Sequence, residues 1–236
     1  MKYAIIAAGE GSRLASEGID APKPLVRIHG ERLIDRLIRV FMDNDATEIV
    51  VICNDLTPLV EQHLRDIQAN GLDGRHIPLR YIVKSTPSSM HSFHAISPFL
   101  TDGKFVLTTV DTIFREEEFR SYVRAFREAD DVDALMGVTD FIDDEKPLHV
   151  GVADDGTVTG FFDQTEHPRF ISGGIYGLTP RCIEVLNGCI LRGEARMRNF
   201  QRALVAEGLR LRAFPFGKIL DIDHAADILT AERFLA

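Results

Sequence analysis

The hydrophobic positions of this chain change their period from segment to segment, and each period predicts a different element. Short apolar runs are typical of strands buried on both faces, and they cover residues 4–8, 48–53, 79–83 and 105–110. Between the first two runs, residues 27–41 carry apolar side chains at helical spacing. A further helix is expected to begin at Thr57, which a proline follows, with Leu59, Leu64 and Ile67 on its apolar side.

Strands that alternate with helices in this way predict βαβ units. We therefore expect an α/β fold with a Rossmann-like mixed, mainly parallel sheet that is flanked by helices. Ligands of such sheets bind beyond the carboxyl ends of the strands, so residues that directly follow a strand are candidates for the functional site.

The second half of the chain is richer in short strands. Strand-like segments lie at residues 134–138, 150–152, 158–162, 170–178 and 209–216, and helical segments at residues 180–191, 197–208 and 225–235. The turn at Asp154-Asp155-Gly156 stands between two apolar runs and predicts a hairpin. No sharp boundary interrupts the chain, so we expect one domain over residues 1–236, made of a half at 1–130 and a smaller β-rich half at 131–236.

Composition narrows the range of partners. The formal net charge of −9 and the sequence pI of about 5.4 argue against nucleic acid and against an anionic membrane surface. The three cysteines show no metal-binding spacing, and their odd number suits reduced thiols in the cytoplasm. No apolar run reaches the length of a signal peptide core or a membrane span, so we expect a cytoplasmic protein. A homo-oligomer stays possible, since the sequence does not specify the oligomeric state.

The first apolar run leads directly into a glycine loop. Gly9 and Gly11 permit positive φ angles and a close approach of the backbone to a ligand, and successive N–H groups in such a loop form a concavity that binds anions. Arg13 adds a planar charged fork for phosphate oxygens, and Lys23 adds a point charge between two prolines. The dinucleotide-binding fingerprint fails because Leu14 stands where a small residue is needed, and no segment forms a P-loop. The pattern therefore predicts a cradle for a triphosphate.

The segment Ala7-Ala8-Gly9-Glu10-Gly11-Ser12-Arg13-Leu14, followed by Pro22-Lys23-Pro24-Leu25, resembles the signature of the nucleotidylyltransferases that make NDP-sugars and related compounds. The resemblance implies that residues 1–130 bind the nucleotide and that residues 131–236 bind the acceptor. It implies catalytic roles for Arg13, Lys23 and Asp111. It also implies that the nucleotide is bound by Ala7, Ala8, Gly9, Gly11, Ser12, Arg13, Ser88 and Ser89.

Carboxylates at two strand ends are the candidate metal ligands. Asp111 ends the apolar run at 105–110, and by resemblance it holds the Mg²⁺ that bridges the nucleotide phosphates. Asp221 and Asp223 alternate with apolar residues, which places both on one face of a strand. We assign the second metal position to Asp221. Asp223 is either a further member of the metal site or a cap of the last helix. Because Mg²⁺ also takes oxygen ligands from phosphate and water, one or two aspartates suffice.

The acceptor half carries weaker signals. Gly173, Gly174 and Tyr176 resemble the segment that lines the acceptor pocket in the family, although a bulge alone also explains paired glycines. Many members carry a Glu-Lys-Pro tripeptide just before this segment, and its lysine grips the sugar phosphate. Residues 162–164 and 166–168 lack that lysine. The arginines that follow later either compensate for it or form a solvated helix face, and they are Arg192, Arg196, Arg198 and Arg202.

The resemblance as a whole implies a Mg²⁺-dependent transfer of NMP from an NTP to a phosphorylated acceptor, a sugar 1-phosphate, with release of pyrophosphate. A phosphocholine-type cytidylyltransferase and a non-catalytic nucleotide sensor of the same fold are the alternatives. A glycosyltransferase is disfavoured, because the expected Asp-x-Asp is missing after Asp111.

Overall fold

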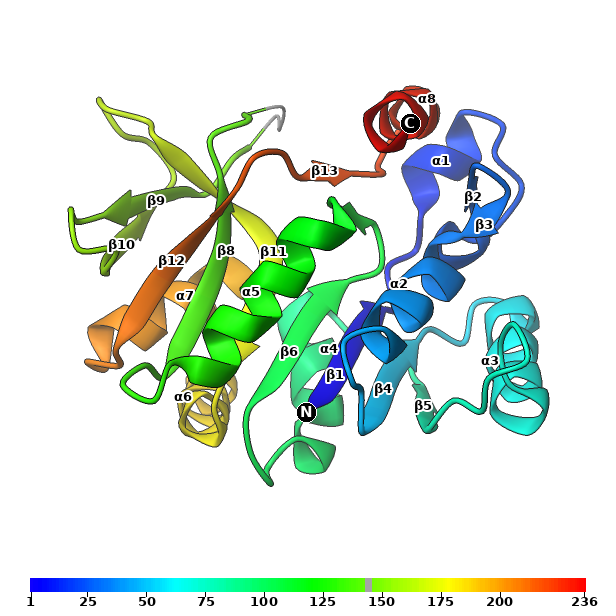
Figure 1. The fold of residues 1–236 in the computed structure, drawn as a ribbon, viewed down its shortest axis with the longest axis horizontal. Helices are drawn as coiled ribbons and strands as arrows, with labels where there is room; N and C mark the ends of the chain where they lie inside the picture. Colours follow the sequence, from blue (N-terminus) through cyan, green and yellow to red (C-terminus); the bar gives the residue numbers. More distant parts are fainter. Residues whose placement is uncertain (143–145) are drawn as a thin grey trace.

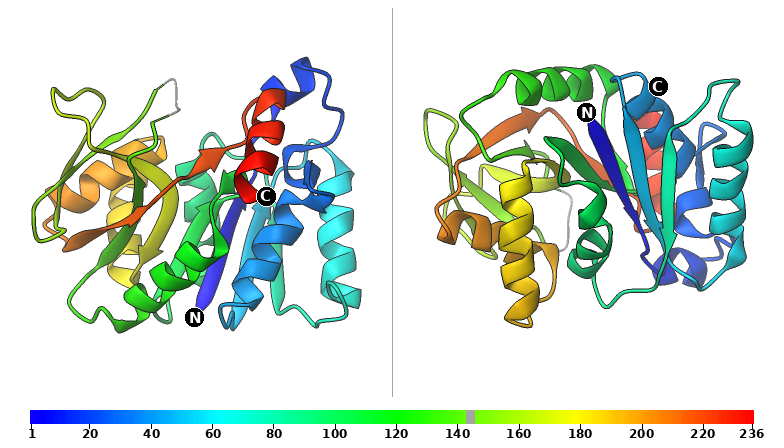
Figure 2. Two further views of the ribbon diagram at one scale, coloured as in Figure 1. Left: turned by 45° about the horizontal axis from the view of Figure 1, so that its top comes forward. Right: turned by 90° about the horizontal axis from the view of Figure 1, so that it is seen from below.

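The computed structural model describes residues 1–142 and 146–236, which form three layers with a twisted sheet between two sets of helices (Figures 1 and 2). Nine strands of this described part form one sheet in the order β10-β9-β11-β6-β1-β4-β5, with β8 beside β11 and β12 beside β8. The strands of the sheet are β1 (Lys2–Ala7), β4 (Glu48–Cys53), β5 (Leu79–Val83), β6 (Phe105–Thr109), β8 (Ala134–Thr139), β9 (His149–Val152), β10 (Val158–Phe162), β11 (Phe170–Leu178) and β12 (Leu211–Phe216).

Strand β1 lies at the centre of the parallel half, where it pairs with β4 on one side and with β6 on the other. Its apolar run is continuous because both of its faces are covered. Tyr3 and Ile5 point into one core, whereas Ala4 and Ile6 point into the other. The predicted α/β fold with its mixed sheet is confirmed, and so are the four strands predicted for the first half.

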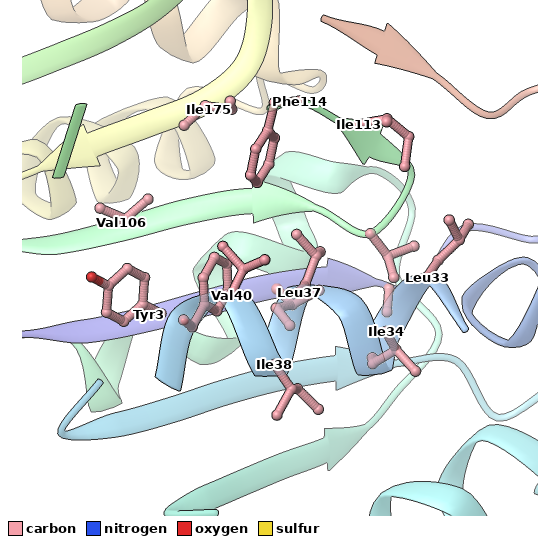
Figure 3. Close-up of a cluster of buried hydrophobic side chains, with 14 of the residues drawn as sticks. Tyr3, Leu33, Ile34, Leu37, Ile38, Val40, Val106, Ile113, Phe114 and Ile175 are labelled. Atoms are coloured by element: carbon pink, nitrogen blue, oxygen red, sulfur yellow. The ribbon is translucent and has the colours of Figure 1, made fainter. Parts of the chain in front are cut away.

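Six helices of the described chain cover the two faces of the sheet (Figure 2). The first core is formed with α2 (Leu33–Met42), α3 (Pro58–Asn70) and α5 (Glu116–Glu128), and the second with α4 (Ser89–Ile96), α6 (Pro180–Leu191) and α7 (Met197–Ala206). Figure 3 shows the first core, where Leu37 and Val40 of α2 pack beside Tyr3. Two short 3₁₀ segments complete this part, η1 (Lys23–Leu25) and η2 (Ser97–Phe99).

Two details of the predicted helices are wrong. The helix expected from residue 27 begins only at Leu33, because residues 27–32 form the hairpin of β2 (Arg27–Ile28) and β3 (Glu31–Arg32). His29 and Gly30 turn that hairpin with φ angles of 48° and 83°. In α3, Leu59 is 50% exposed, and Val60 takes its place on the buried face.

The second half is built around β11, which runs antiparallel to both β6 and β8. The predicted hairpin at Asp154–Gly156 is confirmed, since β9 and β10 pair in antiparallel register on either side of it. The strand expected from residue 209 begins at Leu211, and the preceding helix ends at Ala206. The register of β11 shifts between Ser172 and Tyr176, which makes a bulge at the paired glycines.

The end of the chain returns to the first half. Strand β13 (Leu220–Asp221) pairs with β7 (Thr112–Ile113), directly after β6, and the amide of Ile222 donates to the carbonyl of Asp111 over 3.2 Å. Helix α8 (Ala225–Leu235) then lies beside α1 (Ser12–Ser16), as both views in Figure 2 agree. Glu17 joins the two helices, because its carboxylate accepts from the amide of Ala225 over 2.7 Å.

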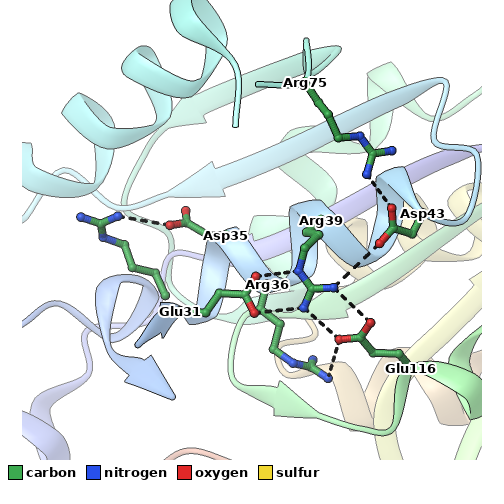
Figure 4. Close-up of polar contacts among 8 residues, drawn as sticks. Glu31, Asp35, Arg36, Arg39, Asp43, Arg75 and Glu116 are labelled. Atoms are coloured by element: carbon green, nitrogen blue, oxygen red, sulfur yellow. Dashed lines mark hydrogen bonds and ion pairs between the residues drawn. The ribbon is translucent and has the colours of Figure 1, made fainter. Parts of the chain in front are cut away.

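An ion-pair network fastens the hairpin to the helices on the first face (Figure 4). The guanidinium of Arg39 contacts Glu31 of β3 at 2.7 Å and Glu116 of α5 at 2.9 Å. These side-chain hydrogen bonds raise the pKa of Arg39 further above its usual range and lower the pKa of Glu116. The network therefore links β3, α2 and α5, and α2 also contacts η1, the segment that contains Lys23.

Candidate functional site

The glycine loop connects β1 to α1 and depends on Gly11. This residue has φ 65° and ψ 24°, and a Cβ placed on it would lie 3.2 Å from the Cβ of Lys23. Position 11 therefore needs a glycine, both for the left-handed turn and for the close approach to Lys23. Gly9 does not have a positive φ, which corrects one part of the prediction, and a Cβ placed on it would meet nothing within 4 Å.

A cavity of about 380 Å³ opens beside this loop, and we call it the glycine-loop cavity. It brings together six of the predicted nucleotide-binding residues with Lys23 and Asp111, and the six are Ala7, Ala8, Gly9, Gly11, Ser88 and Ser89. Ser12 and Arg13 do not line it. Most of its wall is thus backbone and small side chains, which suits a ligand that is read through main-chain amides.

Ser88 reaches the glycine-loop cavity because it is the N-cap of α4. Its Oγ accepts from the amide of His91 over 3.5 Å and lies 2.9 Å from the His91 Nδ1. Thr86 and Ser92 line the same cavity, and their hydroxyls are 2.6 Å apart. The N-terminus of α4 therefore forms the wall that faces the glycine loop, and its cap residue is part of the cavity.

Asn54 is a residue of this site that the sequence analysis missed. It directly follows β4, it is 7% exposed, and its Nδ2 donates to the carbonyl of Gly9 over 3.0 Å. The bond fixes the glycine loop from the neighbouring strand. A polar side chain directly after a buried strand was the available signal, the same signal that singled out Asp111.

Lys23 is the centre of the charged part of the site. Its ammonium lies 2.6 Å from Oδ2 of Asp111 and 2.7 Å from Oδ1 of Asp223. Burial opposes the charge of Lys23, but the two carboxylates outweigh it and raise the pKa of the amine. Burial likewise acts to raise the pKa of Asp223, and the bond from Lys23 overcomes it, so that the pKa is lowered. Two carboxylates from distant segments therefore already converge on one cation.

Arg13 extends this cluster on the other side of Asp223. Its Nη1 lies 3.1 Å from Oδ2 of Asp223, so the two oxygens of one carboxylate bind two different cations. Arg13 is 58% exposed at its side chain and lines a second cavity. Asp223 thus stands between the glycine-loop cavity and this second cavity.

The alternative in which Asp223 caps the last helix is wrong. The N-cap of α8 is His224, and Asp227 completes a capping box with it. The Asp227 carboxylate accepts from the amides of Asp223 and His224 over 2.9 and 2.6 Å. Asp227 therefore holds the backbone of Asp223 in place while the Asp223 carboxylate faces Lys23 and Arg13. The side chain of Asp221 is exposed and lines the second cavity.

The second cavity has a volume of about 270 Å³, and we call it the β13 cavity because Leu220 and Asp221 form one of its walls. Gly173 lines it, and a Cβ placed on this glycine would lie 2.2 Å from Cδ1 of Ile219, so a larger residue here would displace the isoleucine side chain. Gly174 and Tyr176 line neither cavity. Tyr176 is 5% exposed, and burial raises its pKa to about 12.

The structure contains no set of three or more His, Cys, Asp or Glu side chains arranged for a metal within residues 1–142 and 146–236. Across the same residues, every helix is too short or too polar to cross a bilayer. The three cysteines, Cys53, Cys182 and Cys189, are free and buried.

Comparison with known proteins agrees with this geometry. The sequence model described as nucleotidyl transferase matches residues 2–236. The chain belongs to the nucleotidyl transferase family. It is 26% identical over 247 residues to a UTP–glucose-1-phosphate uridylyltransferase of Haloferax volcanii, and the match covers 100% of this chain and 96% of that protein.

Solved structures show the same fold. A putative glucose-1-phosphate thymidylyltransferase from Bacillus anthracis has a TM-score of 0.81 at 18% identity, with 99% of this chain and 94% of that chain covered. The inositol-1-phosphate CTP transferase from T. maritima has a TM-score of 0.77 at 22% identity, with 100% and 97% covered. The resemblance drawn from residues 7–14 and 22–25 is therefore confirmed, and the chain is an enzyme of the nucleotidyl transferase family.

Proposed function

We propose that this nucleotidyl transferase is Mg²⁺-dependent and moves NMP from an NTP to a sugar 1-phosphate, with release of pyrophosphate. The observation that carries the proposal is the position of Lys23, whose ammonium joins Asp111 and Asp223 at the edge of the glycine-loop cavity. This places a positive charge and two potential metal ligands beside a loop suited to phosphate.

The reaction needs positioning more than proton transfer. The acceptor phosphate is already a nucleophile at neutral pH, so it can attack the α-phosphorus of the NTP in line with the leaving pyrophosphate. We assign the NTP to the glycine-loop cavity and the acceptor to the β13 cavity. Lys23 and Arg13 neutralise charge that builds up as the bond to pyrophosphate breaks.

The donor set fits a magnesium ion. Asp111 and Asp223 supply carboxylate oxygens, which Mg²⁺ prefers together with phosphate oxygens and water, and both already bind one cation in Lys23. We propose these two residues as its ligands, and Asp221 stays a third candidate on the adjoining strand. The ion, when bound, would lower the repulsion between the nucleotide phosphates and the incoming phosphate.

Several features support a sugar phosphate as the acceptor. The β13 cavity is lined by groups that hydrogen-bond to hydroxyls, including Thr139, Ser172, Asp221 and Thr230. The Haloferax volcanii relative is named for glucose 1-phosphate, and it aligns with the whole of this chain. We place the reaction in the cytoplasm, where nucleoside triphosphates are available.

The test is the release of pyrophosphate from a panel of four NTPs, each with and without α-D-glucose 1-phosphate, myo-inositol 1-phosphate or phosphocholine. Release that requires both Mg²⁺ and one of the two polyol phosphates is the expected result. Asp111→Asn should remove this activity and leave the thermal unfolding profile in place, because Asp111 follows the strand rather than packing within it. Binding of NTP without any acceptor-dependent turnover would reject the proposal.

A further inference from the structure

The β13 cavity contains negative charges that oppose the binding of a phosphorylated acceptor. Three of its lining side chains are the carboxylates of Asp221, Asp223 and Asp227, and the chain as a whole carries a formal net charge of −9. A phosphate monoester brings roughly 1.5 to 2 further negative charges. Binding therefore requires cations that face the cavity.

Two cations of the described residues meet this need from the second half of the chain. Lys146 and Arg198 both line the β13 cavity, Lys146 from the segment before β9 and Arg198 from α7. Arg13 also lines it, from the first half of the chain, and its guanidinium contacts the carboxylate of Asp223. Lys146 and Arg198 are thus the positive charges on the wall formed by the second half.

The structure orients the guanidinium of Arg198 against the backbone of Lys146. Nη1 of Arg198 contacts Oδ1 of Asp163 at 2.5 Å, and its Nη2 donates to the carbonyl of Lys146 over 3.1 Å. These bonds fix the guanidinium against the backbone of the lysine. A fork that is fixed in advance loses less side-chain entropy when it binds a phosphate.

The negative charge of Asp163 does not neutralise the guanidiniums that surround it. Its second oxygen binds Arg202 at 2.7 Å, so one carboxylate faces two guanidiniums. The bonds from Arg202 and Arg198 lower the pKa of Asp163, which stays ionised at neutral pH. Arg198 and Arg202 thus carry one positive charge more than the single carboxylate that they share.

We propose that Lys146 and Arg198 form the subsite that binds the acceptor phosphate, an inference that rests on the proposed transferase function. Lys146 and Arg198 take the role of the lysine that is missing from residues 162–164. In the sequence, Lys146 belongs to a Glu-Lys-Pro tripeptide at residues 145–147, which precedes β9 instead of following β10. Asp163 and Arg202 are positioning residues, since they act through Arg198.

The experiment measures KM and kcat of Lys146→Met, Arg198→Gln and Arg198→Lys with α-D-glucose 1-phosphate, or with myo-inositol 1-phosphate if that is the acceptor that the wild-type enzyme uses. Loss of one charged hydrogen-bond donor should raise the acceptor KM about 10- to 100-fold. The dissociation constant of the NTP, measured by calorimetry without acceptor, should change less than about twofold. Arg198→Lys should recover part of the acceptor affinity, because it keeps the charge but not the fork.

Arg192→Gln is the matched control, because Arg192 pairs with Glu194 and Glu207 and lines neither cavity. It should leave every kinetic constant unchanged, and circular dichroism should show that each variant is folded. An unchanged acceptor KM in folded Lys146→Met and Arg198→Gln overturns the subsite while the transferase function stands. Absence of acceptor-dependent turnover in the wild-type enzyme rejects the function itself, and the subsite with it.

Discussion

The two cavities of this protein are lined by different kinds of groups. The glycine-loop cavity lies at the carboxyl ends of the parallel strands β1 and β6, and its wall is mainly backbone and small side chains such as Ala8, Gly9 and Ser89. The β13 cavity lies against the bulged antiparallel strand β11, and its wall carries long charged side chains such as Lys146 and Arg198. The main chain therefore forms most of the wall of the glycine-loop cavity, whereas side chains determine the charge of the β13 cavity.

This difference suggests how one fold can serve many acceptors. A triphosphate is common to all reactions of this type, and backbone amides can bind it whatever the rest of the sequence is. An acceptor varies from one reaction to the next, and side chains on loops and helices can be exchanged without altering the sheet. Variants that alter one cavity and leave the other unchanged test this view.

The largest effect is expected from Lys23→Met. It removes the cation that joins Asp111 and Asp223, so kcat should fall on the order of 100- to 1,000-fold. Lys146→Met is the comparison, since we expect it to raise the acceptor KM and to leave kcat within about threefold. Steady-state kinetics with saturating NTP distinguishes the two. A Lys23→Met enzyme whose kcat stays within tenfold of the wild type would remove Lys23 from the catalytic machinery.

The two loop glycines form a second comparison. Gly11→Ala places an alanine at φ 65° and its Cβ 3.2 Å from Lys23, which should lower the free energy of unfolding by about 1–2 kcal/mol. Gly9→Ala meets nothing within 4 Å, so it should leave stability unchanged. Its methyl group would instead enter the space assigned to the nucleotide and raise the KM for NTP on the order of tenfold. Urea unfolding and kinetics of both variants measure these effects, and equal loss of stability in both would contradict them.

Residues 173 and 176 test the β13 cavity in the same way. Gly173→Ala forces Ile219 to move, because its Cβ would lie 2.2 Å from the isoleucine Cδ1, and we expect the acceptor KM to rise about fivefold. Tyr176→Phe removes a buried hydroxyl from a residue that lines neither cavity, so the acceptor KM should stay within about twofold. A strong effect of Tyr176→Phe would restore the acceptor role that the sequence indicated for Tyr176.

The smallest effect concerns the ion pair of Arg39 and Glu116, which lies outside both cavities. The hydrogen bond from Arg39 lowers the pKa of Glu116 in the folded state, so this pair stabilises the fold above the ordinary glutamate pKa. The contribution is lost as the pH falls through the lowered value, and it should stay below about 1 kcal/mol because Glu116 is partly exposed. Urea unfolding between pH 3 and pH 7 should show a shallower dependence for Glu116→Gln than for the wild-type protein. Identical slopes would show that the pair adds nothing.

The residues of the glycine-loop cavity could be predicted from the sequence better than those of the β13 cavity. The reason is that the residues of the β13 cavity are brought together by contacts between segments that lie far apart in the sequence. The glycine loop and Asp111 each directly follow an apolar run that predicts a strand, so a local pattern identifies them, whereas Ser88 was indicated only by the resemblance. Asn54 gave the same local signal after β4 and was missed. The partner of Asp111 was harder to choose, because Asp221 and Asp223 share one pattern and only the folded chain shows that Asp223 reaches Lys23.

The second cavity depends on contacts between distant segments. Lys146 and Arg198 lie far apart in the sequence, and they meet because Arg198 bonds to the Lys146 carbonyl and to Asp163. No periodicity along the chain specifies that meeting. Tyr176 is the opposite case, since its place beside two glycines predicts a binding residue, whereas alternation along β11 turns its side chain into the second core.

The carboxylate of Asp223 binds two cations, and this has a consequence for how the two substrates influence each other. Each of its two oxygens holds a cation from a different side, since Oδ1 binds Lys23 of the glycine-loop cavity and Oδ2 binds Arg13 of the β13 cavity. Any ligand that draws one of these cations away changes how strongly the carboxylate attracts the other. Thermodynamic reciprocity then requires that, if the triphosphate alters the affinity for the acceptor, the acceptor alters the affinity for the triphosphate by the same factor.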